Sequence, residues 1–206
     1  MRPFTRLTAT ACPLPLASVD TDQLIPARFM KRSRAEGYGG HLLYDLRFDA
    51  DGRPRAGFPL DDPRWAGAQV LVARRNFGAG SSREAAVYAL VDFGIRCVVA
   101  PSFGDIFASN AVNNGLLPAR VGEADAEALL SVLQDDGVGE VSVDLEERRI
   151  FAGSLDAAFE IDPVWRTKLL NGWDDLDLTL SHADRIAAFA ARDRALRPWA
   201  APVGGG

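Results

Sequence analysis

The residues best suited to chemistry lie in one segment, Arg75-Asn76-Phe77-Gly78-Ala79-Gly80-Ser81-Ser82-Arg83-Glu84. An apolar run, residues 69–73, leads into it, and a helical pattern, residues 85–93, leads out. A strand, a glycine loop and a helix N-terminus in this order often hold an anion. Free backbone N–H groups and the positive end of the helix dipole converge there. The segment therefore predicts a binding site for a small anion.

Two hydroxyls and a guanidinium stand at the same point of the chain, in Ser81, Ser82 and Arg83. A guanidinium fork suits a carboxylate, and a hydroxyl held over a bound carboxylic acid could move a proton. Gly78 and Gly80 would let a ligand approach the backbone closely. We expect this loop to act on a small carboxylate.

The competing interpretation is that Ser81-x-x-Glu84 is a capping box that only starts a helix. Arg83 in a first helical turn opposes the helix dipole, and Arg75 adds a second cation, so capping alone does not explain the pattern. Other glycine loops fit less well. There is no lysine for a P-loop, an arginine occupies the third glycine position of a dinucleotide fingerprint, and the G-x-S-x-G elbow is absent.

A second group of polar residues precedes a proline, Asp20-Thr21-Asp22 before Pro26. Taken alone, it is best interpreted as an Asx-rich turn. A basic run follows, and it is either a solvated face or a carboxylate clamp; it comprises Arg28, Lys31, Arg32 and Arg34. A third segment, residues 102–118, is interpreted as scaffold: a helix cap, a core face and a helix end.

Composition limits the function further. The chain has 206 residues and a net charge of −5, so its overall field would repel nucleic acid. Two cysteines are too few for an iron–sulfur cluster, and neither His41 nor His182 has a partner at metal-ligand spacing. Cys97 is expected to be a buried thiol. With no signal-peptide pattern and no apolar run long enough to span a bilayer, we expect a cytoplasmic protein.

The pattern of elements predicts one α/β domain. Strands are expected at 70–74 and 96–100, followed by a β region at 140–161 with a hairpin turn at 146–149. Helices are expected at 82–93, 102–113 (capped by Ser102), 123–134, 163–170 (ended by Gly172) and 183–196 (opened by a Ser181–Asp184 capping box). Residues 1–30 carry short β-like stretches, and residues 31–65 form a long loop-rich segment of the kind that is often functional.

Taken in order, these segments resemble the small subunit of 3-isopropylmalate dehydratase, the swivelling domain of the aconitase superfamily. The resemblance rests on residues 4–8, 20–22, 25–29, 76–78, 80–84, 102–103 and 114–118, and on the closing Arg197-Pro198-Trp199. It implies an α/β fold, a swivelling β/β/α domain over residues 1–200. Residues 31–65 would be its substrate-specificity segment and residues 201–206 a flexible tail.

The same resemblance implies a mechanism. A large subunit would carry a [4Fe–4S] cluster, this chain would bind no cofactor itself, and the enzyme would isomerise 2-isopropylmalate through 2-isopropylmaleate in leucine biosynthesis. Ser81 would be the base and Arg83 would bind a carboxylate. Ser82 and the amides around Gly80 would help to position that carboxylate. Asp22 matches an aspartate that lines such sites, and Arg32 or Arg34 would be a further substrate contact.

The chain departs from the family at two places. The family usually continues the S-S-R-E element with His-Ala-Pro-Trp, whereas here Ala85-Ala86-Val87-Tyr88 follows, and it often has cysteine where Ala79 stands. Two alternatives are therefore kept beside the leading one. The chain would serve a related dehydratase of citramalate, maleate or homoaconitate type, or it would be a carboxylate-binding module without catalysis.

Overall fold

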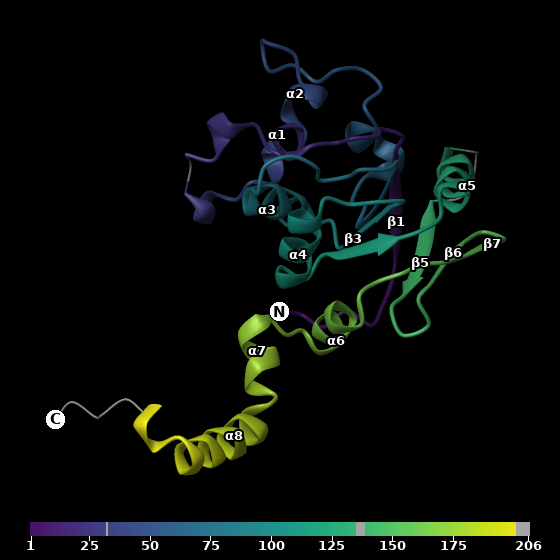
Figure 1. The fold of residues 1–206 in the computed structure, drawn as a ribbon. Coiled ribbons are helices and arrows are strands. Elements are labelled where there is room, and N and C mark those ends of the chain that lie inside the picture. Colours follow the sequence, from purple (N-terminus) through teal and green to yellow (C-terminus); the bar gives the residue numbers. More distant parts are fainter. Residues whose placement is uncertain (32, 135–138, 201–206) are drawn as a thin grey trace.

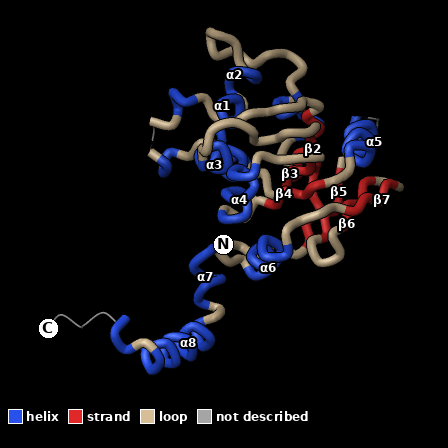
Figure 2. Tube along the Cα trace, in the orientation of Figure 1, coloured by secondary structure: helices blue, strands red, loops and turns tan. Residues whose placement is uncertain are grey.

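A seven-stranded mixed sheet forms the centre of the molecule (Figures 1 and 2). The computed structural model describes residues 1–31, 33–134 and 139–200. The strand order is β4-β3-β2-β1-β5-β6-β7. The strands are β1 (Arg6–Leu14), β2 (Val70–Ala73), β3 (Cys97–Ala100), β4 (Leu117–Arg120), β5 (Glu140–Asp144), β6 (Arg149–Ala152) and β7 (Leu155–Ala158). The predicted α/β class is confirmed.

One half of the sheet is parallel and lies inside the protein. In register, Ala11 of β1 is opposite Val70 of β2, which is opposite Cys97 of β3, which is opposite Leu117 of β4. Every residue of β2 and β3 is buried, as expected for parallel strands covered on both faces. Burial on both faces therefore explains why β2 and β3 appear in the sequence as continuous apolar runs.

The other half is an antiparallel meander, and β1 joins the two halves. Residues 6–10 of β1 pair antiparallel with β5, whereas residues 11–14 pair parallel with β2. Pro13 lies in the stretch beyond the β5 pairing, where its missing N–H leaves no gap in that ladder. The predicted hairpin in the β region is confirmed, because residues 145–148 form the turn between β5 and β6.

Helices cover both faces of the sheet. They are α1 (Thr21–Leu24), α2 (Tyr44–Arg47), α3 (Glu84–Phe93), α4 (Asp105–Asn113), α5 (Glu123–Gln134), α6 (Pro163–Asn171), α7 (Asp175–Leu180) and α8 (Ala183–Leu196). α3 and α4 pack together on one side, and α5 packs against β1 and β2 on the other (Figure 1). The β2–α3–β3–α4–β4 order brings the segments that follow β2 and β3 to one edge of the sheet.

Two predicted helix caps are wrong. The fourth helix begins at Asp105 with Gly104 as N-cap, because the Ser102 hydroxyl is occupied elsewhere. The last helix begins at Ala183 as predicted, but His182 is its N-cap and gives no side-chain cap, while Ser181 ends the helix before it. The end of α6 is confirmed: Gly172 closes it in the left-handed conformation, with φ +70°.

Within the predicted loop-rich segment at 31–65, the described residues consist mostly of turns and short helices and are tied to the body. It carries α2 and short 3-10 helices, with Leu42 and Leu43 fully buried. The Arg47 side chain is also buried; it donates to the carboxylate of Asp61 and to the Leu42 carbonyl at 3.1 Å. A partly buried ion pair and a hydrogen bond to the backbone hold this part of the loop in place.

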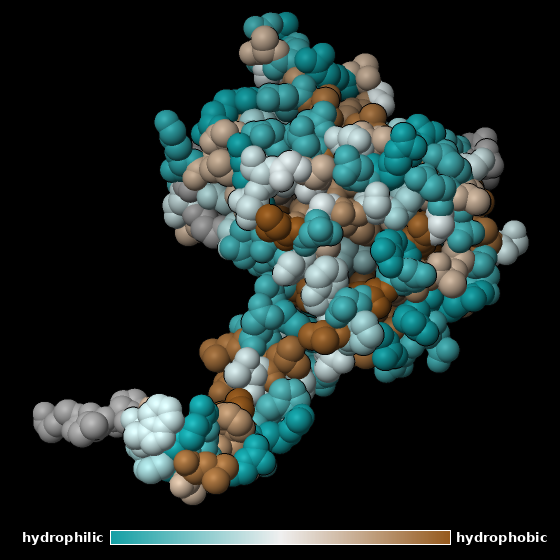
Figure 3. Space-filling view, in the orientation of Figure 1, coloured by the Kyte–Doolittle hydropathy of each residue, from teal (hydrophilic) through white to brown (hydrophobic). Residues whose placement is uncertain are grey.

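The last two helices, α7 and α8, leave the body and project away from it. Brown, apolar residues recur along this projection in the space-filling view (Figure 3). No helix in the described part of the chain is long and apolar enough to cross a membrane. Both cysteines are buried, as expected for Cys97, and burial raises the pKa of the Cys12 thiol to about 12.

Candidate functional site

The loop between β2 and α3, residues 74–83, is fixed on one side by the segment that leads into α1. The Gly78 amide donates to the Val19 carbonyl at 2.7 Å, and the Thr21 amide donates to the Ala79 carbonyl at 2.9 Å. The buried Thr21 hydroxyl donates to the Ser81 carbonyl at 2.9 Å. The two segments singled out in the sequence, 20–22 and 75–84, therefore form one structural unit.

The segment that follows β3 fixes the loop on its other side. The Phe77 amide donates to the Ser102 carbonyl at 3.0 Å, and the Gly104 amide donates back to Phe77 at 2.9 Å. The Ser102 hydroxyl accepts the amide of Asn76 at 2.8 Å. This network uses backbone groups that would otherwise be unpaired, so the loop conformation is defined before any ligand arrives.

Gly78 and Gly80 of the loop have different surroundings. Both adopt positive φ, +71° at Gly78 and +97° at Gly80. A Cβ at Gly78 would lie 2.2 Å from the Phe107 ring, so this glycine is required by internal packing. A Cβ at Gly80 would come no nearer than 3.6 Å to another atom, and this residue is exposed. Close approach by a ligand is open at Gly80. Gly78, although packed against Phe107, also lines a small pocket beside the loop, so its predicted approach to a ligand stays a prediction.

The predicted capping box at Ser81–Glu84 is also wrong. α3 begins at Glu84 with Arg83 as its N-cap, and no side chain caps it. The Glu84 carboxylate instead accepts the side-chain amide of Asn114 at 3.0 Å. Ser81 and Ser82 are both exposed ahead of the helix, and helix capping uses neither hydroxyl. Both are left available for chemistry.

The backbone also offers donors here. Within the described residues, no hydrogen bond is made by the amides of Gly80, Ser81 or Ser82. They stand directly before the N-terminus of a ten-residue helix. Unpaired amides at a helix N-terminus form an anion site of the kind predicted for this loop.

Asp22 and Arg83 lie together, 61 positions apart in the sequence, as an ion pair between Oδ1 and Nη1. The Arg83 side chain is 21% exposed and that of Asp22 is 55% exposed. Asp20, two positions earlier, is the N-cap of α1 and accepts the Gln23 amide at 2.7 Å. The Asx-turn interpretation therefore holds for Asp20, whereas Asp22 orients a guanidinium beside Ser81.

The structure describes only part of the basic run at residues 28–34. Arg28 forms an ion pair with Asp45, which holds the pKa of that carboxyl below its usual value, and its guanidinium lies 4.6 Å from the Phe29 ring centroid. Arg32 lies outside the described residues. Arg34 begins a short 3-10 helix, Arg34–Glu36, but its side chain is also outside the described part. Their predicted substrate contact stays a prediction.

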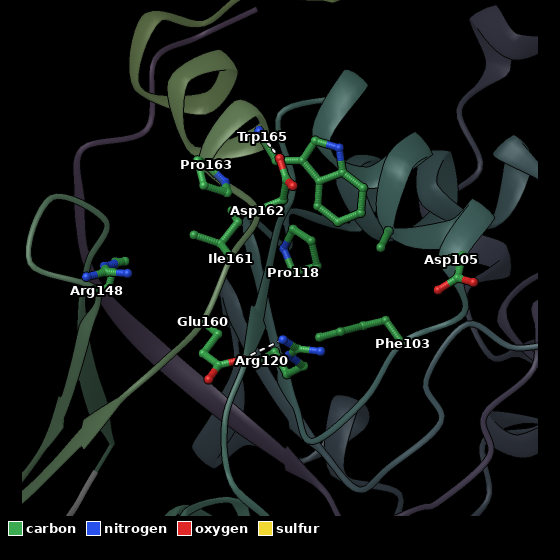
Figure 4. A pocket seen from close by; sticks show the side chains of 11 residues that line it. Phe103, Asp105, Pro118, Arg120, Arg148, Glu160, Ile161, Asp162, Pro163 and Trp165 are labelled. Carbon is green, nitrogen blue, oxygen red and sulfur yellow. Dashed lines mark hydrogen bonds and ion pairs between the residues drawn. The ribbon is translucent and has the colours of Figure 1, made fainter.

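A small pocket of about 180 Å³ lies against the loop, and Gly80, Ser81, Asp105 and Phe107 line it. A larger cleft of about 540 Å³ adjoins it and shares Asp105 (Figure 4). In that cleft Arg120 is paired with Glu160, and Asp162 caps α6. These polar groups already have partners, and the small pocket, unlike the cleft, is lined by Ser81 of the predicted site, so it is the better candidate for chemistry.

Two supporting residues were missed at the sequence level. Thr21 was noted only as part of a turn, although its position between two aspartates was the available signal. Ser102 was assigned to a helix cap, and no local signal indicates that its hydroxyl reaches a loop 26 positions earlier. Among the described residues there is no group of three or more His, Cys, Asp or Glu side chains that could hold a metal ion.

Comparison with known proteins agrees with this geometry. Residues 1–124 match the aconitase C-terminal domain family, and residues 175–203 match the family of C-terminal domains of the 3-isopropylmalate dehydratase small subunit. A 3-isopropylmalate dehydratase small subunit of Rhodospirillum centenum is 46% identical over 201 residues, 97% of this chain and 99% of that protein. One from Caulobacter vibrioides is 46% identical over 203 residues, 97% of this chain and 98% of that protein.

A solved structure supports the fold independently. The crystal structure of 3-isopropylmalate dehydratase from Methanocaldococcus jannaschii superimposes with a TM-score of 0.63 at 26% identity, and covers 90% of this chain and 99% of that one. The swivelling-domain fold class expected from the resemblance is thereby confirmed. On matches that span nearly its whole length, the chain belongs to the family of 3-isopropylmalate dehydratase small subunits.

Proposed function

We propose that this chain is the small subunit of a heteromeric hydro-lyase that isomerises 2-isopropylmalate to 3-isopropylmalate through 2-isopropylmaleate, in leucine biosynthesis. One observation carries the assignment. Ser81 is exposed at a pocket, the amides of Gly80, Ser81 and Ser82 make no hydrogen bond within the described residues, and Arg83, paired with Asp22, follows two positions later in the chain. A carboxylate held there would place a hydroxyl close to the carbon next to it, where a proton must leave.

Arg83 and the loop amides would bind one substrate carboxylate. The guanidinium is already turned toward a carboxylate, that of Asp22, so little reorganisation is needed when the substrate arrives. Ser82 and the amide of Gly80 would hold the remaining oxygen. Their contribution is orientation, which removes much of the entropy cost of the reaction.

Ser81 would act as the base that removes the proton and later returns it. A serine hydroxyl is a poor base in water, but its surroundings favour the ionised form. The α3 N-terminus, the unpaired amides and the Arg83 guanidinium all stabilise negative charge at this point. Asp22 would line the same site and keep Arg83 in place.

The partner would be a large subunit that carries a [4Fe–4S] cluster. When bound there, such a cluster supplies Lewis-acid chemistry on the substrate hydroxyl. The present chain would close over the substrate and contribute the base, the arginine and the amides. We place both subunits in the cytoplasm.

The main alternative is a related diacid dehydratase of citramalate, maleate or homoaconitate type. The observation that favours it is Ala85, which is half-buried in the first turn of α3 where the family usually has histidine. Loss of an imidazole one residue beyond Glu84 would change the polarity near the site. A carboxylate-binding module without catalysis is the third candidate.

The test is reconstitution of the full chain with a cluster-loaded large subunit under anaerobic conditions. Alkene absorbance is followed with 2-isopropylmalate, citramalate and malate as substrates. The proposal predicts a preference for 2-isopropylmalate, and no iron or turnover for the purified chain alone. Turnover by the chain alone would refute the two-subunit proposal. Turnover on a smaller diacid only would favour the alternative, and a complex without turnover would favour the binding module.

A further inference from the structure

The end of the chain forms an arm that the rest of the molecule does not cover. We define the arm as residues 174–200, which contain α7, α8 and the 3-10 helix Pro198–Ala200. It extends away from the sheet and its covering helices (Figures 1 and 3). Among the described elements, the main packing partner of α8 is that 3-10 helix, which belongs to the arm itself.

The arm is rich in exposed apolar side chains. They are Leu176 (65% exposed), Leu180 (59%), Ile186 (48%), Phe189 (55%), Leu196 (74%) and Trp199 (81%). Short helices without a packing partner are marginally stable in water, and contiguous apolar surface of this kind marks a site of interaction. Nothing in the described part of the chain therefore covers the apolar side chains of the arm.

The centre of this surface is one side of α8. Ile186 and Phe189, three positions apart, share one side of the helix and line a hollow of about 640 Å³ with His182, Arg185 and Arg192. The Arg192 guanidinium lies 5.8 Å from the Phe189 ring centroid. An apolar centre flanked by two arginines fits a partner with an apolar groove and carboxylates at its rim.

The base of the arm is fixed to the body. Lys168 of α6, whose side chain is 3% exposed, donates to Asp175 at 2.6 Å and also to Asn113 of α4. Asn113 in turn donates to Asp175 at 3.1 Å. Because this network joins the first turn of α7 to α4 and α6, the arm starts from a defined position, which lowers the entropy cost of docking.

The identity of the partner follows from which parts of the chain the two family models cover. Residues 1–124 match a domain described as the C-terminal domain of aconitase, which is part of a longer chain. Residues 175–203 match a domain described as belonging to the dehydratase small subunit. A fused domain is held beside its partner by the peptide chain, whereas a separate subunit must be held by contacts. The arm is the segment that carries the small-subunit match.

We propose that the arm is the docking element by which this chain holds the large subunit. Ile186 and Phe189 enter an apolar groove of that subunit, and Arg185 and Arg192 face carboxylates at its rim. The inference rests on the proposed function and deepens it by assigning the surface that makes the complex.

The test compares two double variants of the full chain. Ile186→Ser with Phe189→Ser removes the apolar anchors, and Ala187→Ser with Ala191→Ser makes the same number of serines at exposed positions on the other side of α8. The Kd for the cluster-loaded large subunit is measured by titration calorimetry, and turnover is measured at saturating concentration. We expect the Kd to rise about tenfold or more for the first variant only, with kcat unchanged.

Three results would overturn the inference. Equal Kd values for both variants would show that the arm is not a contact. A dimer of the chain alone that the first variant dissociates, with an unaltered Kd for the large subunit, would show that a second copy covers the arm. Failure of the wild-type chain to bind the large subunit would overturn the proposed function itself. Circular dichroism establishes that both variants keep their helices.

Discussion

The residues of the site divide into those proposed to do chemistry and those that hold the loop. Ser81 lines the small pocket, Ser82 is exposed and Arg83 is partly exposed, and their residue types alone predicted this chemistry. Thr21 and Ser102 bond the loop from two sides, through contacts that join positions far apart in the chain. Such contacts depend on the assembled fold: the only local signal was the place of Thr21 between two aspartates, and none pointed to Ser102. The sequence therefore identified the first group and missed the second.

At Arg83 we expect the two parallel N–H donors of the guanidinium to contribute more to substrate binding than its charge does. Arg83→Lys keeps the charge but loses the two parallel donors, so the KM for the dicarboxylate substrate should rise about tenfold or more in the reconstituted complex. Arg75→Lys is the matched control, because it makes the same change at an exposed position of the same loop. Steady-state kinetics measure both, and an equal KM for the two variants would contradict the role of Arg83.

A substitution at Gly78 tests how tightly the loop packs against Phe107. Gly78→Ala should lower the free energy of unfolding by about 1–3 kcal/mol more than Gly57→Ala does. Both glycines have positive φ, +71° and +78°, so both variants carry the same backbone strain. Only at Gly78 would the new Cβ meet a ring, 2.2 Å from Phe107; at Gly57 nothing lies within 4 Å. Urea unfolding measures the difference in free energy of unfolding. Equal losses of stability in the two variants would show that the Phe107 ring moves aside for the new Cβ.

Among the elements, the apolar and helical periods located β2, β3, α5 and α6 closely, because burial and capping act within each of them. β1 was not predicted as one strand. Its two ends pair with β2 and β5, which lie some 60 and 130 residues away, and only the assembled sheet makes it continuous. β4 was not predicted as a strand, because residues 102–118 were interpreted as a helix with its cap and end. Its Pro118 is tolerated because β4 is an edge strand.

The β1–β5 pairing carries a pH-dependent ion pair. Asp144, whose side chain is 6% exposed, accepts the Glu147 amide and pairs with Arg6. These contacts lower the pKa of Asp144 below its ordinary value of 3.8, mainly through the Glu147 amide. The carboxylate is therefore bound more firmly in the folded protein than in the unfolded one. Its contribution is complete above about pH 4 and is lost as pH falls through the lowered folded-state pKa.

Asp144→Asn should remove this contribution. At pH 7 the variant should unfold with a free energy about 1–3 kcal/mol lower than that of the wild type. The difference should shrink as the pH is lowered below 4, since the wild-type carboxyl then takes up a proton. Urea unfolding from pH 7 to pH 2.5 gives the two curves. A difference that stays constant over this range would contradict the assignment.

At the scale of the whole molecule, the body carries the candidate loop between β2 and α3, and the apolar arm projects from it at the end of the chain (Figure 1). The extent of a single domain over residues 1–200 stays a prediction, and the tail at 201–206 lies outside the described residues. The net charge of the chain is −5, whereas the apolar side of α8 carries two arginines, Arg185 and Arg192. An exposed loop and an exposed apolar arm are both expected in a subunit that binds a larger partner.

The measurement that tests the account most directly is turnover of 2-isopropylmalate by the reconstituted complex with Ser81→Ala, compared with Ser82→Ala. Both serines are exposed and neighbouring, so the two variants should fold and bind the large subunit alike. If Ser81 is the base, kcat should fall by about a hundredfold or more for Ser81→Ala and much less for Ser82→Ala, with an unchanged Kd for the large subunit. A Ser81→Ala complex that turns over at the wild-type rate would contradict the central claim.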